Sequence, residues 1–398
     1  MANETNIFSF GEGSDPMEKA REALSAVRQY QQDWQNDGVN RVYKYFNDIE
    51  GNWLDDFKAP PINNSFAPIS NTTFSNIYKQ LKLLGLSKTF IENVALPSWW
   101  KSEIEENKCE IAKLVMSLAK RLHLEINVFP GSSELSLDFT PIPAKKFKLQ
   151  KKQNNPELFS YLSTSIANIN LEFFDRPYIP LSADPIVTRK SILKKNSCVN
   201  LESLLDFCWN HGIPVIHFDF FDIFGKGKNR PAKSDGLVIV IKNRPVIIIG
   251  SSRKYSAWLL FILAHELGHI ANGHLQEGIL SDESFKDGVN DHEENVANRF
   301  STQLLLGDIP LYWNRNLDKK TLLRKVQCLS EEHSLDPGTL ILNYAWKTGH
   351  WGYAVEALKR LEPNANAPVQ INTYYQNHFT SMDEEGREYL KRINVLAN

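Results

Sequence analysis

The sequence has few cysteines and no long apolar segment, and both absences narrow the class of protein. Only 4 of its 398 residues are cysteine, and no two of them form a C-x-x-C pair. A disulfide framework is therefore not expected, and free thiols in a reducing compartment are the simpler interpretation. No apolar run approaches the length of a bilayer span, and the first residues lack the basic and apolar regions of a signal peptide. We expect a cytoplasmic protein with no membrane partner.

An excess of charge of one sign is absent as well. The formal net charge is −2, so the chain as a whole does not attract nucleic acid or an anionic membrane. Binding to DNA would need a local patch, and the densest basic run extends from Lys145 to Lys152. A solvated linker is the first interpretation of this run, and a phosphate-contacting arm is the alternative. The N-terminal helical region is the other candidate for contact with DNA, because its short helices are spaced as in helix-turn-helix domains. A short helical bundle that does not bind DNA is the alternative for this region.

The chain also has no Walker A motif, no G-x-G-x-x-G and no G-x-S-x-G. What it does contain is His265-Glu266-Leu267-Gly268-His269, a complete H-E-x-x-H. Two histidines four residues apart project from one face of a helix, and two neutral imidazoles side by side suit a zinc ion. Glu266 follows the first histidine, where it can act as a general base. The alternative is a polar helix face that never meets a metal.

A catalytic zinc needs three protein ligands, and the residues after the motif exclude one class of site. The metzincin pattern requires glycine and histidine where this chain has Asn272 and Leu275. His274 is tempting, but it lies about 180° round the helix from His265 if the helix continues. We therefore expect His274 to be an ordinary polar residue at the helix end.

A second helix, predicted from about His292 to Leu306, offers a carboxylate instead. Glu294 and Asn298 lie one turn apart, which resembles the E-x-x-x-D arrangement of gluzincins, where the second residue supports a ligand histidine. We favour Glu294 as the third ligand over Glu293, whose register is one residue off. Solvated acids are the alternative for both, because acids favour helix N-termini. A cysteine that reaches the metal through the fold also stays open.

The two segments together resemble the ImmA/IrrE family of zinc metallopeptidases. H-E-L-G-H at 265–269 is paired with E-N-V-A-N-R-F-S at 294–301, and two leucines follow shortly after. Family members usually carry E-x-x-A-N-x-F-A and then L-L-M-P. Here Ser301 replaces the second alanine and Leu306-Gly307 replaces Met-Pro, and both are packing positions, so the departures leave the expected ligands in place.

This resemblance implies a Zn²⁺-dependent endopeptidase with His265, His269 and Glu294 as ligands and Glu266 as the catalytic base. It also implies cleavage of a partner regulator, a repressor or an antitoxin-like protein, in stress response, mobile-element control or phage defence. Two alternatives stay open: a DNA-binding transcriptional regulator whose peptidase fold serves partner binding or sensing, and a toxin held off by an antitoxin. The second donor to the oxyanion is open too, with His274, His292 and Tyr344 as candidates.

We predict an α+β fold that is mostly helical. Its small zincin-like peptidase core, a short β-sheet packed on the H-E-x-x-H helix, is flanked by N- and C-terminal helical regions. A hairpin of strands at 236–241 and 245–249 could offer an edge to an extended substrate, and the tail at 370–396 is expected to be helical and peripheral. The predicted domain division has five parts. They are a helical N-terminal extension at 1–60, a helix-turn-helix-like domain at 61–143, a linker with helices at 144–198, the peptidase domain at 199–310 and a C-terminal helical region at 311–398. The part at 61–143 resembles the XRE-like region of long family members.

Overall fold

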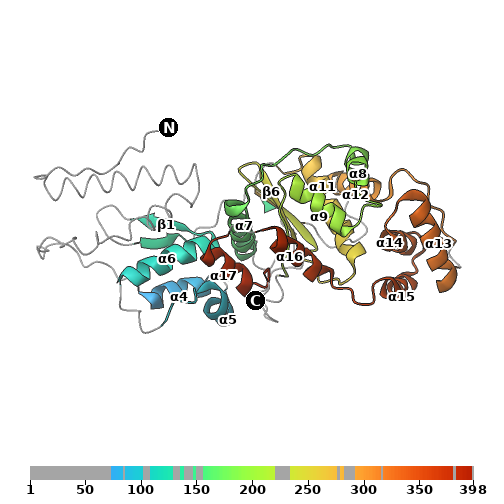
Figure 1. Cartoon of the computed structure of the whole chain (residues 1–398). Coiled ribbons are helices and arrows are strands. Elements are labelled where there is room, and N and C mark those ends of the chain that lie inside the picture. Colours follow the sequence, from blue (N-terminus) through green and yellow to red (C-terminus); the bar gives the residue numbers. More distant parts are fainter. Residues whose placement is uncertain are drawn as a thin grey trace, which may run out of the picture. The chain divides into compact units, whose positions relative to one another are not determined.

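The computed structural model divides the chain into two units, Met1–Asn71 and Thr72–Asn398 (Figure 1). The residues that the structure describes all belong to the second unit; they are 73–83, 86–101, 108–128, 135–138, 147–148, 156–219, 234–275, 278–281, 292–314, 317–379 and 382–396. The predicted extension at 1–60 lies outside them, so it stays a prediction, as do the other domain boundaries.

The described residues are mostly helical with a small sheet, as an α+β fold requires. The helices are α4 (Phe74–Leu83), α5 (Lys88–Phe90), η1 (Ile91–Ala95), α6 (Lys108–Leu122), α7 (Pro156–Phe173), α8 (Pro185–Leu193), α9 (Leu201–Asn210), α11 (Ser256–Ala271), α12 (His292–Leu306), α13 (Lys319–His333), α14 (Pro337–Thr348), α15 (Trp351–Leu361), α16 (Ala367–His378) and α17 (Glu384–Arg392). Within this part of the chain, no helix is long and apolar enough to cross a membrane.

Capping residues explain where several of these helices begin. Asn200 accepts a hydrogen bond from the Ser203 amide at 2.9 Å, and the Ser203 hydroxyl accepts one from the Asn200 amide at 2.9 Å. This reciprocal capping box satisfies two amides at the start of α9. Asp336 caps α14 through the Thr339 amide at 2.7 Å, and Pro337 follows it in the first turn, where its missing N–H costs nothing.

The main sheet has five strands in the order β3-β7-β5-β6-β4, and a separate hairpin joins β1 to β2. The strands are β1 (Glu125–Val128), β2 (Leu135–Asp138), β3 (Phe147–Lys148), β4 (Val215–His217), β5 (Gly236–Ile241), β6 (Arg244–Ile249) and β7 (Gly278–Ser281). β5 pairs antiparallel with both β6 and β7, whereas the two outer strands pair parallel to their neighbours.

The predicted hairpin is confirmed as β5 and β6, but the prediction that it forms a sheet edge is wrong. Lys242 and Asn243 turn the chain with φ of 49° and 60°, the left-handed values that a tight hairpin turn requires. β7 and β4 then flank the hairpin on its two sides, so the outer positions belong to β3 and β4. Local patterning shows that two strands pair, but it does not show which distant segments join them.

The basic run from Lys145 to Lys152 is described only at Phe147 and Lys148. These two residues form β3, paired with Ile279 and Leu280 of β7. This part of the run therefore belongs to the sheet, which differs from the expected solvated linker. Contact between the run and DNA stays a prediction.

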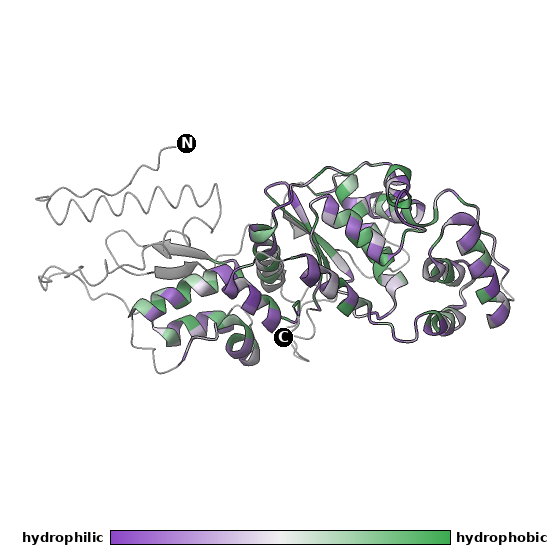
Figure 2. Ribbon diagram, in the orientation of Figure 1, coloured by the Kyte–Doolittle hydropathy of each residue, from purple (hydrophilic) through white to green (hydrophobic). Residues whose placement is uncertain are grey.

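The sheet lies between two hydrophobic cores. Leu237, Ile239, Val246 and Ile248 face one core, while Val238, Val240, Ile247 and Ile249 face the other. This is the two-residue alternation of a strand, and both faces are apolar because helices cover both. α7 packs on the first face, and α11 packs on the second (Figures 1 and 2).

The expectation that the tail at 370–396 is peripheral is wrong. Ile371, Tyr375, Tyr389 and Leu390 are all fully buried. The sequence of α17 is highly charged, yet its acids Glu385 and Glu388 pair with Arg121 of α6. Because this partner comes from a segment far away in the chain, the sequence of the tail alone does not reveal the contact.

Candidate metal centre

The H-E-x-x-H segment lies in the last two turns of α11, a helix that is apolar over most of its surface. His265, Glu266 and His269 are 2%, 0% and 1% exposed. Burying imidazoles and a carboxylate is unfavourable unless each has a suitable partner. A buried polar cluster in such an apolar helix is therefore a candidate functional site.

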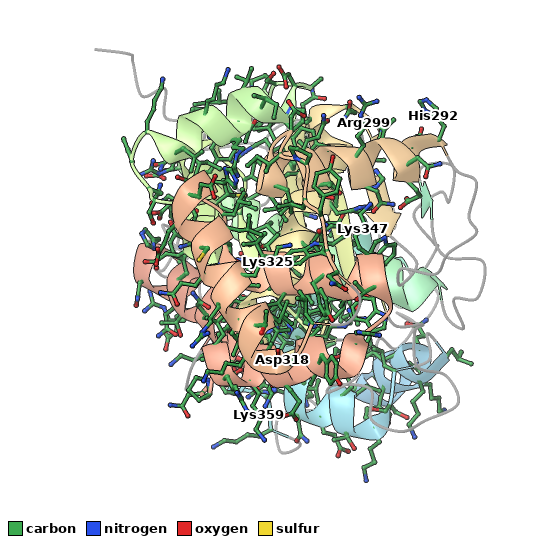
Figure 3. The ribbon with its side chains drawn as sticks, turned by 90° about the vertical axis from the view of Figure 1, so that its right-hand side faces the viewer. His292, Arg299, Asp318, Lys325, Lys347 and Lys359 are labelled. Atoms are coloured by element: carbon green, nitrogen blue, oxygen red, sulfur yellow. The ribbon has the colours of Figure 1, made fainter. Side chains whose placement is uncertain are left out.

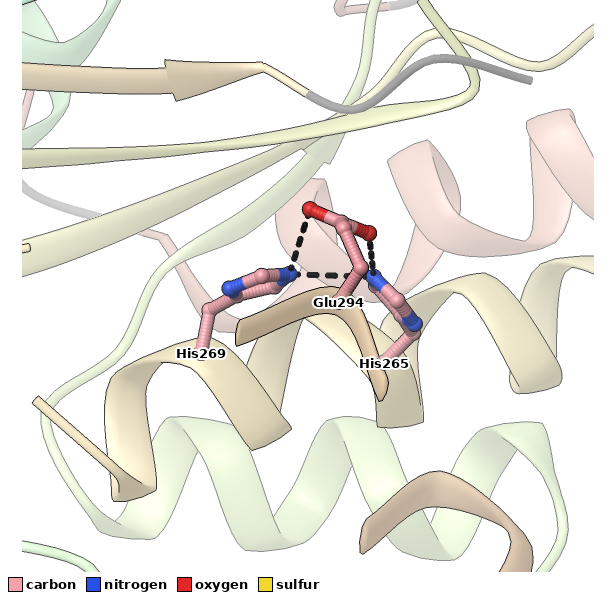
Figure 4. A group of neighbouring side chains, drawn as sticks. All are labelled: His265, His269 and Glu294. Atoms are coloured by element: carbon pink, nitrogen blue, oxygen red, sulfur yellow. Dashed lines mark hydrogen bonds and ion pairs between the residues drawn. The ribbon is translucent and has the colours of Figure 1, made fainter. Parts of the chain in front are cut away.

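α12 approaches this part of α11 closely because small residues meet at the contact. A Cβ atom added to Gly268 would lie 2.9 Å from Cα of Ala297 and 3.2 Å from Cβ of Phe300. The absence of a side chain at position 268 therefore allows the backbones to come together. One turn before Ala297, Glu294 reaches across to the two histidines (Figure 4).

Three potential ligand atoms converge at this crossing. Nε2 of His265 lies 3.0 Å from Nε2 of His269. One oxygen of Glu294, Oε2, lies 3.3 Å from the first nitrogen, and the other, Oε1, lies 3.5 Å from the second. A tetrahedral zinc with bonds of about 2.0–2.1 Å separates its ligand atoms by about 3.3 Å. The observed separations are of this size, so the two imidazoles and the carboxylate could hold one ion, and catalytic zinc sites with three protein ligands keep a fourth position for water or substrate.

The hydrogen bonds of the rings are compatible with this role. Nδ1 of His265 lies 3.1 Å from Oδ1 of Asn298, an atom that can only accept, so Nδ1 donates and Nε2 keeps its lone pair. Asn298 thus has the supporting position that its spacing from Glu294 predicted. On the other ring, Nδ1 of His269 lies 2.8 Å from Nδ1 of His274.

The position of His274 corrects the expectation from helical spacing. α11 ends at Ala271, so His274 does not lie half a turn away on a continuing helix. It contacts His269 through the ring nitrogen that faces away from Glu294. Glycine frequently terminates helices, so Gly273 was the sequence signal that the helix ends before His274.

Glu266 lies against the first residue of β5. A Cβ atom on Gly236 would be 2.1 Å from Oε1 of Glu266 and 2.8 Å from a methyl carbon of Ile262. Only a glycine leaves room for the carboxylate there. Pattern reasoning missed Gly236, because nothing local links it to a helix 30 residues further on.

The remaining candidates lie elsewhere. His292 is exposed at the outer start of α12 (Figure 3), and the Tyr344 hydroxyl pairs with Nδ1 of His350 at 3.1 Å. Glu293 is partly exposed and is not in the group formed by the two histidines and Glu294. All four cysteines are in the described part of the chain, all are free thiols, and none belongs to this group.

No family model, no curated protein and no solved structure matches this chain. The grounds for a function are therefore the geometry and chemistry of the site itself, together with the resemblance of its two motifs.

Proposed function

We propose that the chain is a zinc-dependent metalloendopeptidase that cleaves a partner regulator, a repressor or an antitoxin-like protein. The observation that carries the proposal is the convergence of the two α11 histidines with Glu294 at separations of 3.0–3.5 Å. Two imidazoles and one carboxylate form a ligand set of catalytic zinc sites, which keep one position open. The packing of the short sheet on α11 supports the finer proposal of a zincin-like core.

In this proposal His265, His269 and Glu294 hold the metal. Zinc, when bound, supplies a Lewis acid and brings the pKa of water down to about 7. Asn298 holds the His265 ring in the tautomer that leaves Nε2 available. The apolar surroundings of α11 exclude bulk water and strengthen the charge interactions within the site.

Glu266 is the proposed general base. Its carboxylate takes a proton from the attacking water and then gives that proton to the leaving amine nitrogen of the peptide. A site that served only for binding a partner would not need this acid next to a ligand. The intact Glu266 therefore favours catalysis over the alternative of a sensing or docking fold. The proposed substrate, a partner regulator, rests on the resemblance to the ImmA/IrrE family. That resemblance implies cleavage of a repressor or an antitoxin-like protein.

The test compares wild-type protein with Glu266→Gln, which keeps the size of the side chain but removes the base. New protein N-termini are mapped in cells that produce either form. We expect the wild type to create new termini in one or a few proteins, and we expect Glu266→Gln to bind zinc normally while cleavage falls by about 100-fold or more. An equal set of new termini from both forms would exclude the proposed mechanism.

A matched control is His333→Ala, which removes a histidine at the end of α13, where the ring pairs only with its neighbour Glu332. This control should cleave like the wild type.

A further inference from the structure

The end of α11 has the hydrogen-bond pattern of a Schellman motif. Asn272 is the last residue near helical geometry, and Gly273 follows with φ of 65°. The Gly273 amide donates to the Ile270 carbonyl at 3.1 Å, and the His274 amide donates to the His269 carbonyl at 3.1 Å. These are the two bonds by which the motif satisfies the last carbonyls of a helix.

The Schellman motif explains why His274 lies over His269. In this motif the second residue after the cap folds back over the residue that begins the last turn, and an apolar contact between those two side chains often accompanies it. Here both positions are histidine. Their rings meet edge to face, with centroids 4.9 Å apart and an interplanar angle of 72°, and the contact is the 2.8 Å approach of the two Nδ1 atoms.

A bound metal would set the direction of this hydrogen bond. A neutral imidazole that binds a metal through Nε2 carries its proton on Nδ1. With zinc on Nε2, His269 would therefore donate and Nδ1 of His274 would accept. The proton of His274 would then be on its own Nε2.

We propose that His274 is a positioning residue: it accepts from Nδ1 of His269 and so fixes the ring and the tautomer of that proposed zinc ligand. This inference rests on the proposed zinc site. His274 contacts Nδ1 of His269, the ring nitrogen opposite to the one that lies beside Glu294. It does for His269 what Asn298 does for His265, so each α11 histidine has a side-chain hydrogen-bond partner on its outer nitrogen, Nδ1.

The experiment measures zinc affinity directly. The full-length chain is stripped with a chelator and titrated with zinc against a chromophoric competitor. We expect His274→Ala to bind zinc about 10- to 100-fold more weakly, as is typical when a partner of a ligand histidine is lost. His274→Asn supplies another acceptor oxygen and should recover most of the affinity. His333→Ala, which lacks contact with the site, should match the wild type.

A second readout is the tautomer itself, seen by long-range ¹H–¹⁵N NMR of the histidine rings in the zinc-loaded protein. We expect the proton of His274 on Nε2 and that of His269 on Nδ1. Circular dichroism verifies that each variant is folded, and the asparagine variant keeps the test valid if His274→Ala does not fold.

The outcomes separate the two proposals. If wild-type protein binds no zinc at this site, both the proposed function and this inference are overturned. If the wild type binds zinc but His274→Ala binds it as tightly, only the role of His274 is overturned. Equal weakening in the alanine and asparagine variants would also contradict an acceptor role, because it would show that only the shape of the ring matters.

Discussion

At the scale of single residues, the position of Glu266 depends on a residue that carries no side chain. Gly236 begins β5 directly beside the Glu266 carboxylate, and any Cβ there would overlap Oε1. The proposed base is thus held between its own helix and the sheet. Such packing fixes where the carboxylate can accept a proton, which matters because small displacements of a catalytic group have large effects on rate.

Gly236→Ala should therefore separate catalysis from metal binding. The added methyl group must push the Glu266 carboxylate away, since the calculated separation of 2.1 Å is far below contact distance. We expect the rate of cleavage to fall about 100-fold while zinc affinity changes little, because none of the three proposed ligands is touched. Zinc titration and cleavage assays on the same preparation measure both. A variant with unchanged cleavage would show that the location of Glu266 against β5 is irrelevant to activity.

The residues that the sequence alone identified are those with short-range spacing rules. His265 and His269 follow from one helical turn, and Glu294 was chosen over Glu293 because of its spacing from Asn298. The contact between His274 and His269 was not predicted, because helical spacing past Ala271 would place the two rings on different sides of α11. Gly236 could not be found, since only the tertiary fold places it beside Glu266.

At the scale of elements, the crossing of α11 and α12 decides whether a third ligand can reach the histidines. At this crossing the backbone of Ala297 lies so near Gly268 that a Cβ atom on the glycine would be 2.9 Å from Cα of Ala297. α12 is also held at its other end, where buried Arg189 donates to the carbonyls of Leu304 and Leu305 at 3.2 and 2.9 Å. α12 is thus held at its crossing with α11 and at its C-terminal end.

Gly268→Ala tests this dependence on close packing. The new methyl group would lie 2.9–3.1 Å from backbone atoms of Ala297, which cannot rotate away as a flexible side chain would. We expect a loss of about 1–3 kcal/mol of stability from overpacking and a weaker zinc affinity, because Glu294 moves with α12. Urea unfolding and zinc titration measure the two effects.

The matched control for this crossing is Gly352→Ala. Gly352 is also in a helix, but a Cβ atom there would meet nothing within 4 Å. The control should leave zinc affinity unchanged and should slightly raise stability, since alanine is the better helix former. Equal zinc affinity in both alanine variants would contradict the importance of the crossing.

The sheet shows what element-level patterns can and cannot predict. The β5–β6 hairpin was predictable from alternating apolar residues and a short polar turn. Its neighbours were not, because β4 and β7 join it from either side of the sequence. At the β4 side, Asn372 of α16 accepts from the His217 amide at 2.9 Å and donates to the His217 carbonyl at 3.0 Å. A side-chain amide thus takes the place of a further strand at that residue.

At the scale of the whole described unit, a buried ionic contact attaches α17 to α6. Arg121 is fully buried; it lies 2.6 Å from the Glu388 carboxylate and donates to the Val94 carbonyl at 3.2 Å. Lys120 pairs with Asp383 at 2.7 Å beside it. The two ion pairs connect residues more than 260 positions apart, so they explain why the charged tail belongs to the core.

Arg121→Ala should destabilise the unit by about 3 kcal/mol, because the variant loses a buried ion pair with Glu388 and the hydrogen bond to the Val94 carbonyl. Lys88→Ala is the control: it removes an exposed pair with Glu92 at 3.7 Å and should cost less than about 1 kcal/mol. Unfolding in urea measures both, and equal losses in the two variants would contradict the structural role of Arg121.

The difference in stability between wild type and Arg121→Ala should depend on pH, and the direction of this dependence follows from the pKa of Glu388. Burial raises the pKa of Glu388, but Arg121 and Arg392 outweigh burial and hold that pKa below its ordinary value. The contribution of the pair is therefore complete above the ordinary glutamate pKa and is lost as the pH falls through the lowered pKa. The gap in stability between wild type and Arg121→Ala should narrow over that acidic range.

The proposed zinc site of His265, His269 and Glu294 can be tested by X-ray absorption at the zinc edge of the purified, zinc-loaded chain. We expect one zinc per chain, with nitrogen and oxygen neighbours at about 2.0–2.2 Å and no sulfur neighbour at about 2.3 Å. We also expect Glu294→Ala, but not Glu293→Ala, to lose the ion. A sulfur neighbour, or stoichiometric zinc that survives Glu294→Ala, would contradict the proposed site.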